Sequence, residues 1–181
     1  MDDRLVTGVG GPPARLESAS EGTGPGPEGR GQPPHIIAMV GVPFAITVRV
    51  RYVECDMQGH VFNGHYLTWF DMAHTALLNE ALPRPYSELV ASGIDVVVAE
   101  SGTRYLAPAR FEDELEIGVE LEPPTNSSLT SRFTVSRDGT RIAEGFLRHV
   151  CVDARTVQKR SWPEEIRAAF APYVAPAVTA Y

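Results

Sequence analysis

One carboxylate in this sequence stands where it could do chemistry on a carbonyl group. Asp56 lies in a short polar segment that contains Gly59, just before a helical stretch that begins near Gly64. A helix N-terminus carries unpaired N–H groups and the positive end of the helix dipole, so it can polarise a carbonyl and stabilise a developing oxyanion. A nearby carboxylate can then attack the carbonyl carbon or activate a water molecule. Hydrolysis of a thioester requires these two parts and no metal.

Other reactive side chains lie close to Asp56 and leave alternatives open. Glu54, two residues upstream, is a rival carboxylate. Cys55 with His60 or His65 could form a thiol–imidazole nucleophile, although a lone cysteine among scattered histidines is usually inert. Asp56, His60 and His65 could also imitate a set of metal ligands, but their spacing crosses a glycine turn and matches no common zinc pattern. On position alone, Asp56 would be a turn or helix-capping residue.

The helix that follows must position this chemistry. Residues 64–82 are predicted to be helical, and Pro83 and Pro85 end the helix. Its polar residues are three and four positions apart and form one narrow stripe, which consists of Thr68, Asp71, Thr75 and Asn79. Apolar residues cover most of the remaining circumference. This pattern predicts a helix that is largely enclosed by other structure.

Strands precede and follow this helix. Residues 44–52 alternate apolar and polar side chains with a period of two, which is typical of a strand with one buried face. Four further segments have strand patterns, at residues 94–106, 115–121, 129–137 and 140–153. Asp138-Gly139 predicts a two-residue hairpin turn between the last two. Pro163 and the acids after it predict a short helix that reaches Phe170. One curved antiparallel sheet around a buried helix satisfies this order of elements.

The first part of the chain differs from the rest. Within residues 1–35 there are eight glycines and six prolines, and hardly any β-branched or aromatic residues. Such a segment cannot bury enough apolar surface to offset the entropy of ordering itself. We therefore predict a disordered tail at residues 1–38 and one domain at residues 39–175. The alternative explanation is a translation start placed too early, with Met39 as the true first residue.

The overall composition excludes several classes of protein. A net charge of −7 argues against a nucleic-acid partner, whose phosphates require a basic surface. There is no run of 18 apolar residues and no secretory signal, so no membrane span is predicted. Two cysteines without metal-ligand spacing favour a reducing, cytoplasmic location.

Three blocks of the sequence, in order, carry a resemblance to a known family. The first runs from Tyr52 through Asp56 and Gly59 to the aromatic pair Trp69-Phe70. The second covers residues 105–117, and the third covers residues 149–153 before Pro163-Glu164-Glu165. In these blocks residues 44–171 resemble the 4-hydroxybenzoyl-CoA thioesterase-like hotdog family, particularly its YbgC-type acyl-CoA thioesterases.

The resemblance implies an α+β hotdog fold, a curved antiparallel sheet wrapped around a long central helix, and an enzyme that hydrolyses acyl-CoA without a cofactor. Asp56 corresponds to the catalytic carboxylate, as nucleophile or as general base. Asn63 and Gly64 stand at the helix entrance, where a backbone N–H meets the thioester oxygen. YbgC-type proteins often carry histidine in place of Asn63, a change that its backbone role survives; Asn63 also has the position of a helix cap. Tyr66, in the first turn, is expected to contact the acyl group.

The resemblance leaves the substrate and the exact activity open. Family active sites lie at a dimer interface, which implies a homodimer or homotetramer. A thioester on an acyl carrier protein competes with acyl-CoA as substrate, and Arg104, Arg110 and Arg148 are candidate contacts for an acidic carrier. A hotdog hydratase or dehydratase is a further alternative, with His60 as the only loose partner for Asp56. A non-catalytic acyl-thioester-binding protein is the last alternative.

Overall fold

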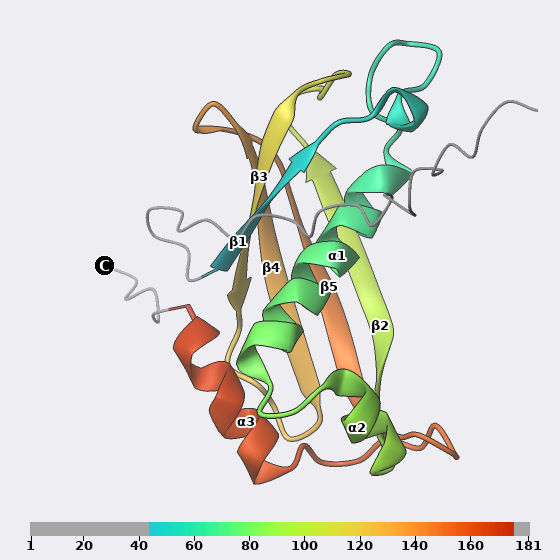
Figure 1. Cartoon of the computed structure of the whole chain (residues 1–181), viewed down its shortest axis with the longest axis vertical. Helices are drawn as coiled ribbons and strands as arrows, with labels where there is room; N and C mark the ends of the chain where they lie inside the picture. The colour runs from blue at the N-terminus through green and yellow to red at the C-terminus, as the bar shows by residue number, and fades with distance from the viewer. Residues whose placement is uncertain (1–43, 176–181) are drawn as a thin grey trace, which may run out of the picture. The chain divides into compact units, whose positions relative to one another are not determined.

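The structure, a computed structural model, describes residues 44–175 and contains one antiparallel sheet. The predicted tail at residues 1–38 lies outside the described residues. In the sheet the strands stand in the order β1-β3-β4-β5-β2 (Figure 1). Their bounds are β1 Phe44–Arg49, β2 Ile94–Tyr105, β3 Glu114–Leu121, β4 Ser128–Arg137 and β5 Thr140–Asp153.

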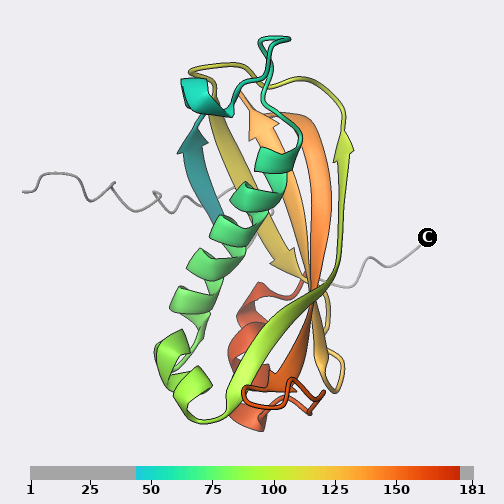
Figure 2. The ribbon, with the colours of Figure 1, turned by 90° about the vertical axis from the view of Figure 1, so that its right-hand side faces the viewer.

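One long helix covers one face of this sheet. The helix α1 (Gly64–Ala81) runs along the sheet, which curves around it (Figures 1 and 2). The shorter helices are α2 (Tyr86–Ala91) and α3 (Glu164–Phe170), and single 3-10 turns are η1 (Tyr52–Glu54) and η2 (Ala171–Tyr173). This is the arrangement predicted for a hotdog domain, and the predicted α+β fold is confirmed. Within residues 44–175, no helix is both long and apolar enough to span a bilayer.

The middle of the sheet is built from consecutive strands, and its two edges are joined by α1. Asp138 and Gly139 have φ angles of 50° and 72°, the left-handed conformation that a two-residue hairpin turn requires, so β4 and β5 pair as neighbours. β1 and β2 lie at opposite edges of the sheet. The chain therefore crosses the whole sheet through α1, and the segment before α1 is brought near the end of β2.

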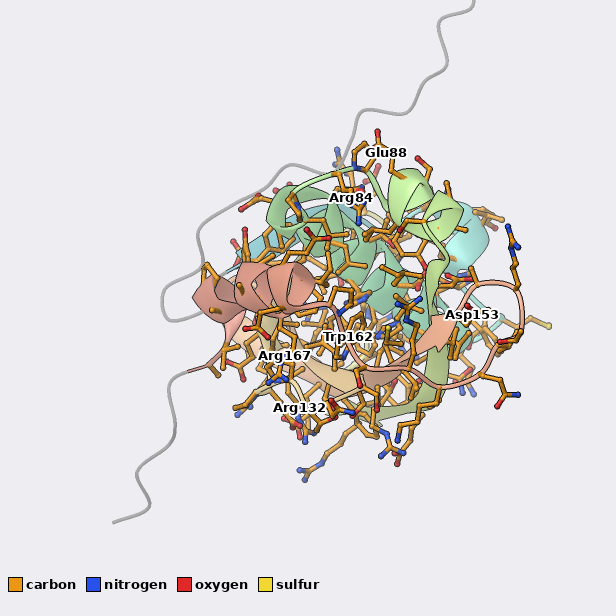
Figure 3. The ribbon with its side chains drawn as sticks, turned by 90° about the horizontal axis from the view of Figure 1, so that it is seen from below. Arg84, Glu88, Arg132, Asp153, Trp162 and Arg167 are labelled. Atoms are coloured by element: carbon orange, nitrogen blue, oxygen red, sulfur yellow. The ribbon has the colours of Figure 1, made fainter. Side chains whose placement is uncertain are left out.

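The apolar side of α1 packs closely on the sheet. The ring of Phe70 stacks on Phe133 with 4.5 Å between ring centroids. A Cβ atom at Gly145 would overlap the Phe70 ring and lie 2.6 Å from the Gly102 carbonyl oxygen, so only glycine allows this close approach. Trp162, labelled in Figure 3, is buried, and its ring packs edge-to-face on Phe170 of α3 at 5.5 Å. The contacts of Phe70 with Phe133 and Gly145 set the distance between α1 and the strands.

Three expectations from the sequence require correction. The first strand ends at Arg49 instead of continuing to Tyr52, because the chain turns into η1 and leaves Tyr52 78% exposed. The helix α2 was not predicted, since six residues are too few to show helical periodicity. The helix α1 is not enclosed on all sides, because Leu67 and Met72 are exposed beside the predicted polar stripe.

Candidate active site

A cavity of about 470 Å³ opens at the N-terminal end of α1. Its walls come from the loop before α1, the first turn of α1, the end of β2 and the residues that follow β2. The lining residues are Asp56, Gln58, His60, Val61, Phe62, Asn63, Tyr66, Tyr105, Leu106, Ala107 and Pro108. The cavity thus brings together three of the four predicted site residues, and Gly64 lies beside them at the first position of α1.

Asp56 is held in a tight turn at the mouth of this cavity. Its N–H donates to the His60 carbonyl at 2.8 Å, and its own carbonyl accepts from the N–H of Gly59 at 3.0 Å. Gly59 has a φ angle of 73°, which glycine adopts without strain. The Gln58 N–H donates to Oδ1 of Asp56 at 2.8 Å. One carboxylate oxygen is therefore fixed by the backbone, while the residue as a whole stays exposed.

Hydrogen bonds tie this loop to a segment more than forty residues away. The Val61 N–H donates to the Ala109 carbonyl at 2.9 Å. The Tyr105 hydroxyl donates to the Asn63 carbonyl at 3.0 Å. The two bonds hold the loop and the start of α1 against the residues that follow β2, so both walls of the cavity are anchored.

The helix entrance differs from the prediction in one respect. Asn63 was expected to be a helix cap, but its side chain makes no capping hydrogen bond and its backbone is already helical, with φ −53° and ψ −33°. The first hydrogen-bonded turn begins one residue earlier, at Phe62, whose carbonyl accepts from the His65 N–H at 3.0 Å. Among the described residues, the N–H groups of Asn63 and Gly64 have no hydrogen-bond acceptor. They are available to a carbonyl oxygen bound in the cavity.

Tyr66 forms a wall of the cavity and has little exposed surface. Its ring packs on Trp69 at 5.1 Å and on Tyr105 at 5.0 Å between centroids. Burial raises the pKa of the Tyr66 hydroxyl above its ordinary value, so the group stays protonated at neutral pH. Tyr66 is 2% exposed, so it offers little surface for the contact with an acyl group that the sequence predicts.

Glu54, the rival carboxylate, is buried in a structural role. The backbone N–H of Arg51 donates to Oε2 at 2.7 Å, and the Arg51 guanidinium donates to Oε1 at 2.8 Å. The indole N–H of Trp69 adds a bond of 3.3 Å to Oε1. Burial alone would raise the pKa of Glu54, but the hydrogen bonds and charge of Arg51 outweigh it and lower the pKa. This carboxylate fixes the turn that leads into the Asp56 loop.

Glu54→Gln is expected to destabilise the protein by about 2 kcal/mol, because a buried amide cannot accept all three donors and one of them loses its partner. The measurement is the free energy of unfolding from urea titration at pH 7. Glu122→Gln is the matched control, since Glu122 is an exposed partner of Arg132 and its loss is expected to change stability by less than about 1 kcal/mol. Equal effects of the two substitutions would show that Glu54 has no special structural role.

The remaining reactive side chains near Asp56 do not form a second centre. Cys55 is a free, half-buried thiol whose Sγ lies 4.0 Å from the Arg51 carbonyl oxygen. His60 lines the cavity, whereas His65 packs edge-to-face on the ring of Phe62 at 6.2 Å. In residues 44–175 no group of three or more His, Cys, Asp or Glu side chains is arranged to hold a metal ion. Asp56, His60 and His65, whose spacing only imitates a set of metal ligands, form no such group there.

The three arginines considered for a carrier protein are not gathered at the cavity mouth. Arg104 pairs with Glu144 at 3.3 Å, and Arg148 pairs with Glu100 at 2.8 Å. His149 is buried on the face covered by α1, so the alternation of side chains along β5 places Arg148 on the opposite face. Arg110 is exposed and makes no ion pair among the described residues.

The sequence alone did not identify the far wall of the cavity. Tyr105, Leu106, Ala107 and Pro108 line it, although no local pattern marked them as site residues. They come together with Asp56 only because β2 and α1 run side by side, a contact between distant parts of the chain. Their only signal was membership of the second block of the family resemblance.

Comparison with known proteins identifies the family and supports the fold. The family described as "Thioesterase-like superfamily" matches residues 50–170. The acyl-CoA thioester hydrolase YbgC of Escherichia coli O6:H1 is 32% identical over 130 residues, which are 70% of this chain and 95% of that protein. A hypothetical protein, TT1821, from Thermus thermophilus has a TM-score of 0.66 and 32% identity, over 71% of this chain and 98% of the other. A second Thermus thermophilus protein, a thioesterase complexed with coenzyme A and Zn, has a TM-score of 0.65 and 26% identity, over 77% and 100% of the two chains.

Proposed function

The chain belongs to the thioesterase-like superfamily, and from this membership we propose that it hydrolyses acyl-CoA thioesters to a carboxylic acid and free coenzyme A. The observation that carries the proposal is the cavity that Asp56 shares with the entrance of α1. A relative named as an acyl-CoA thioester hydrolase, 32% identical to this chain, supports the choice of substrate.

The proposed mechanism uses two groups on opposite sides of the thioester carbonyl. The carbonyl oxygen accepts hydrogen bonds from the N–H groups of Asn63 and Gly64, where the positive end of the α1 dipole stabilises the oxyanion of the tetrahedral intermediate. The Asp56 carboxylate either attacks the carbonyl carbon, with the resulting anhydride then hydrolysed by water, or takes a proton from the attacking water. Both routes need Asp56 at the same side of the cavity, and both release the thiolate of coenzyme A, which is then protonated.

The test of this function is release of free thiol from a panel of acyl-CoAs that runs from acetyl-CoA to palmitoyl-CoA and includes benzoyl-CoA thioesters. We expect hydrolysis of a subset of the panel by the purified protein. A folded protein that binds members of the panel and releases no thiol from any of them would refute the enzyme and support a non-catalytic binding protein. The position of the three arginines gives no support to a carrier protein as substrate.

His60 is the one observation that favours a second candidate. It lines the same cavity as Asp56, and hydration of an enoyl thioester uses an aspartate with a histidine. Loss of the enoyl absorbance of crotonyl-CoA, without release of thiol, identifies that activity. Thiol release without loss of the double bond identifies the hydrolase.

We also propose that the protein is a homodimer, or a tetramer of such dimers, formed through β2. This strand is 12 residues long and lies at an edge of the sheet, with no strand on its outer side among residues 44–175. A long unpaired edge strand is a template for another strand, and exposed apolar side chains at Val98, Tyr105 and Leu106 accompany it. We expect sedimentation equilibrium to give two or four times the mass of the chain. A monomeric mass at micromolar concentration would refute this assembly.

A further inference from the structure

A second cavity, of about 240 Å³, lies between α1 and β2 at the end away from Asp56. Its outer edge is the polar stripe of α1, including Asp71 and Asn79, and its wall on the sheet includes Val98 of β2. At its floor are two histidines, His74 from α1 and His149 from β5. The acyl-CoA reaction proposed above uses none of these residues.

The two histidines form a buried stacked pair. Their ring centroids are 4.0 Å apart and the planes are inclined by 8°. Nδ1 of His74 is hydrogen-bonded to the Ser131 hydroxyl at 2.9 Å, whereas Nδ1 of His149 is buried without a partner among the described residues. Burial lowers the pKa of His149 to about 4 and lowers the pKa of His74 well below 6.5, so both rings are neutral at pH 7.

We infer that the other nitrogen of His149 is a hydrogen-bond donor toward the cavity, which this residue lines. A buried N–H group without an acceptor is rarer than a buried acceptor without a donor, which favours the tautomer with no proton on Nδ1. The ring proton is then on Nε2, which is not among the buried unpartnered atoms and makes no hydrogen bond within residues 44–175. A ligand oxygen that accepts from Nε2 would complete the hydrogen bonding of this ring.

The charge and shape of the cavity define the ligand group. None of its lining residues is lysine or arginine, and Asp71 contributes a carboxylate, so an anionic group is disfavoured. The side chains of Leu78, Val96 and Val98 provide an apolar surface beside the polar edge. A neutral hydroxyl or keto oxygen on an apolar body fits this combination of one donor, a polar edge and an apolar wall.

Pairing of two copies through β2 would bring this cavity next to the Asp56 site. With the two-fold axis at the middle of β2, where the register shift between Val98 and Glu100 lies, Tyr105 opposes the partner subunit's Ile94 and Thr103 opposes the partner subunit's Val96. Opposed residues of an antiparallel pair point to the same face. Tyr105 borders the first cavity and Val96 borders the second, so one protomer's Asp56 cavity would stand beside its partner's His149 cavity.

We propose that the cavity at His74 and His149 binds the distal part of the acyl group and selects acyl chains that carry a neutral hydroxyl or keto oxygen. The oxygen accepts a hydrogen bond from Nε2 of His149 and contacts the polar edge of α1 at Asn79. This inference rests on the proposed thioesterase function and on pairing through β2.

The test is a comparison of acyl-CoA pairs that differ by one hydroxyl group, namely benzoyl-CoA with 4-hydroxybenzoyl-CoA and hexanoyl-CoA with 6-hydroxyhexanoyl-CoA. We expect kcat/KM of the intact enzyme to favour the hydroxylated member of at least one pair by about tenfold or more, since leaving a buried polar group unpaired penalises the other member. Equal kcat/KM values within both pairs overturn the inference while the thioesterase function stands. Absence of hydrolysis of every acyl-CoA tested refutes the proposed thioesterase function, and this inference fails with it.

Variants then locate the selection. His149→Phe keeps a flat ring but removes the donor, and is expected to reduce the hydroxyl preference to less than threefold. Asn79→Leu, at an exposed position of α1, is expected to lower the ratio of kcat/KM for the hydroxylated and unhydroxylated substrates. This variant tests whether the preference arises in this cavity when His149→Phe does not fold. Arg148→Gln is the matched control, because this neighbouring residue of β5 pairs with Glu100 on the opposite face, and its ratio is expected to equal that of the intact enzyme. A preference that survives Asn79→Leu and, where it folds, His149→Phe overturns the assignment to this cavity.

Discussion

Asp56→Asn is expected to lower kcat for acyl-CoA hydrolysis by at least about 10²–10³, the scale of losing one oxyanion donor. The asparagine keeps the size of the side chain and can still accept the Gln58 N–H at Oδ1, so the turn is preserved. What it lacks is the negative charge that attacks the carbonyl carbon or removes a proton from water. The measurement is thiol release at saturating substrate, beside the thermal unfolding midpoint of the same preparation.

Asp138→Asn is the matched control for this loss. Asp138 is exposed in the β4–β5 turn with a φ angle of 50°, a conformation that asparagine also adopts readily. The substitution Asp138→Asn removes one negative charge, as Asp56→Asn does, but at a position outside the cavity. We therefore expect kcat to be unchanged. If Asp56→Asn keeps near-normal kcat, or if both variants lose activity equally, Asp56 is not the catalytic carboxylate.

The second large effect is a loss of stability in weak acid. Burial lowers the pKa of His149 from 6.5 to about 4, and burial together with the charge of His149 lowers that of His74 well below 6.5. The unfolded chain takes up these protons near pH 6.5, while the folded protein takes them up only at lower pH. The free energy of unfolding therefore falls as the pH falls from about 6.5 to 4, by about 3 kcal/mol for His149 alone. Urea titrations at several pH values measure it.

The pH window separates the histidines from the carboxylates. Glu54 has a pKa lowered from 4.5, so the stability that it contributes is present above pH 4.5 and is lost only as the pH falls below that value. Between pH 4.5 and 6.5 the slope is thus expected to arise from His74 and His149. His149→Phe is expected to flatten this slope by roughly one proton, and an unchanged slope in that variant would show that His149 takes up its proton over the same pH range in the folded and unfolded states.

Local patterns in the sequence predicted most of the sheet and the long helix. Alternation along residues 115–121 and the Asp138-Gly139 turn fixed the positions of β3, β4 and β5, because period-two burial and left-handed turn residues depend only on neighbours in the chain. The strand before the Asp56 loop was overextended, since the burial of Glu54 by Arg51 and Trp69 depends on α1, a separate element.

The site could be predicted only on its near side. Asp56 and Asn63 were placed at one cavity mouth because the loop leads directly into α1, and their catalytic roles stay predictions. The contact of Tyr105 with Asn63, and the stacking of His74 on His149, depend on how β2 and β5 lie under α1. Predicting such contacts requires knowing how strands that are distant in the sequence pair with one another. The periodicity of a single segment does not give this register.

The strand order has a consequence for how the protein becomes active as it folds. β3, β4 and β5 are consecutive strands joined by short connections, so their pairing closes small loops and costs little chain entropy. β1 pairs with β3 across the whole of α1 and β2, and the cavity exists only when Asn63 meets Tyr105 at the end of β2. A chain that has formed only its central three strands therefore holds most of its sheet and has no site for the reaction.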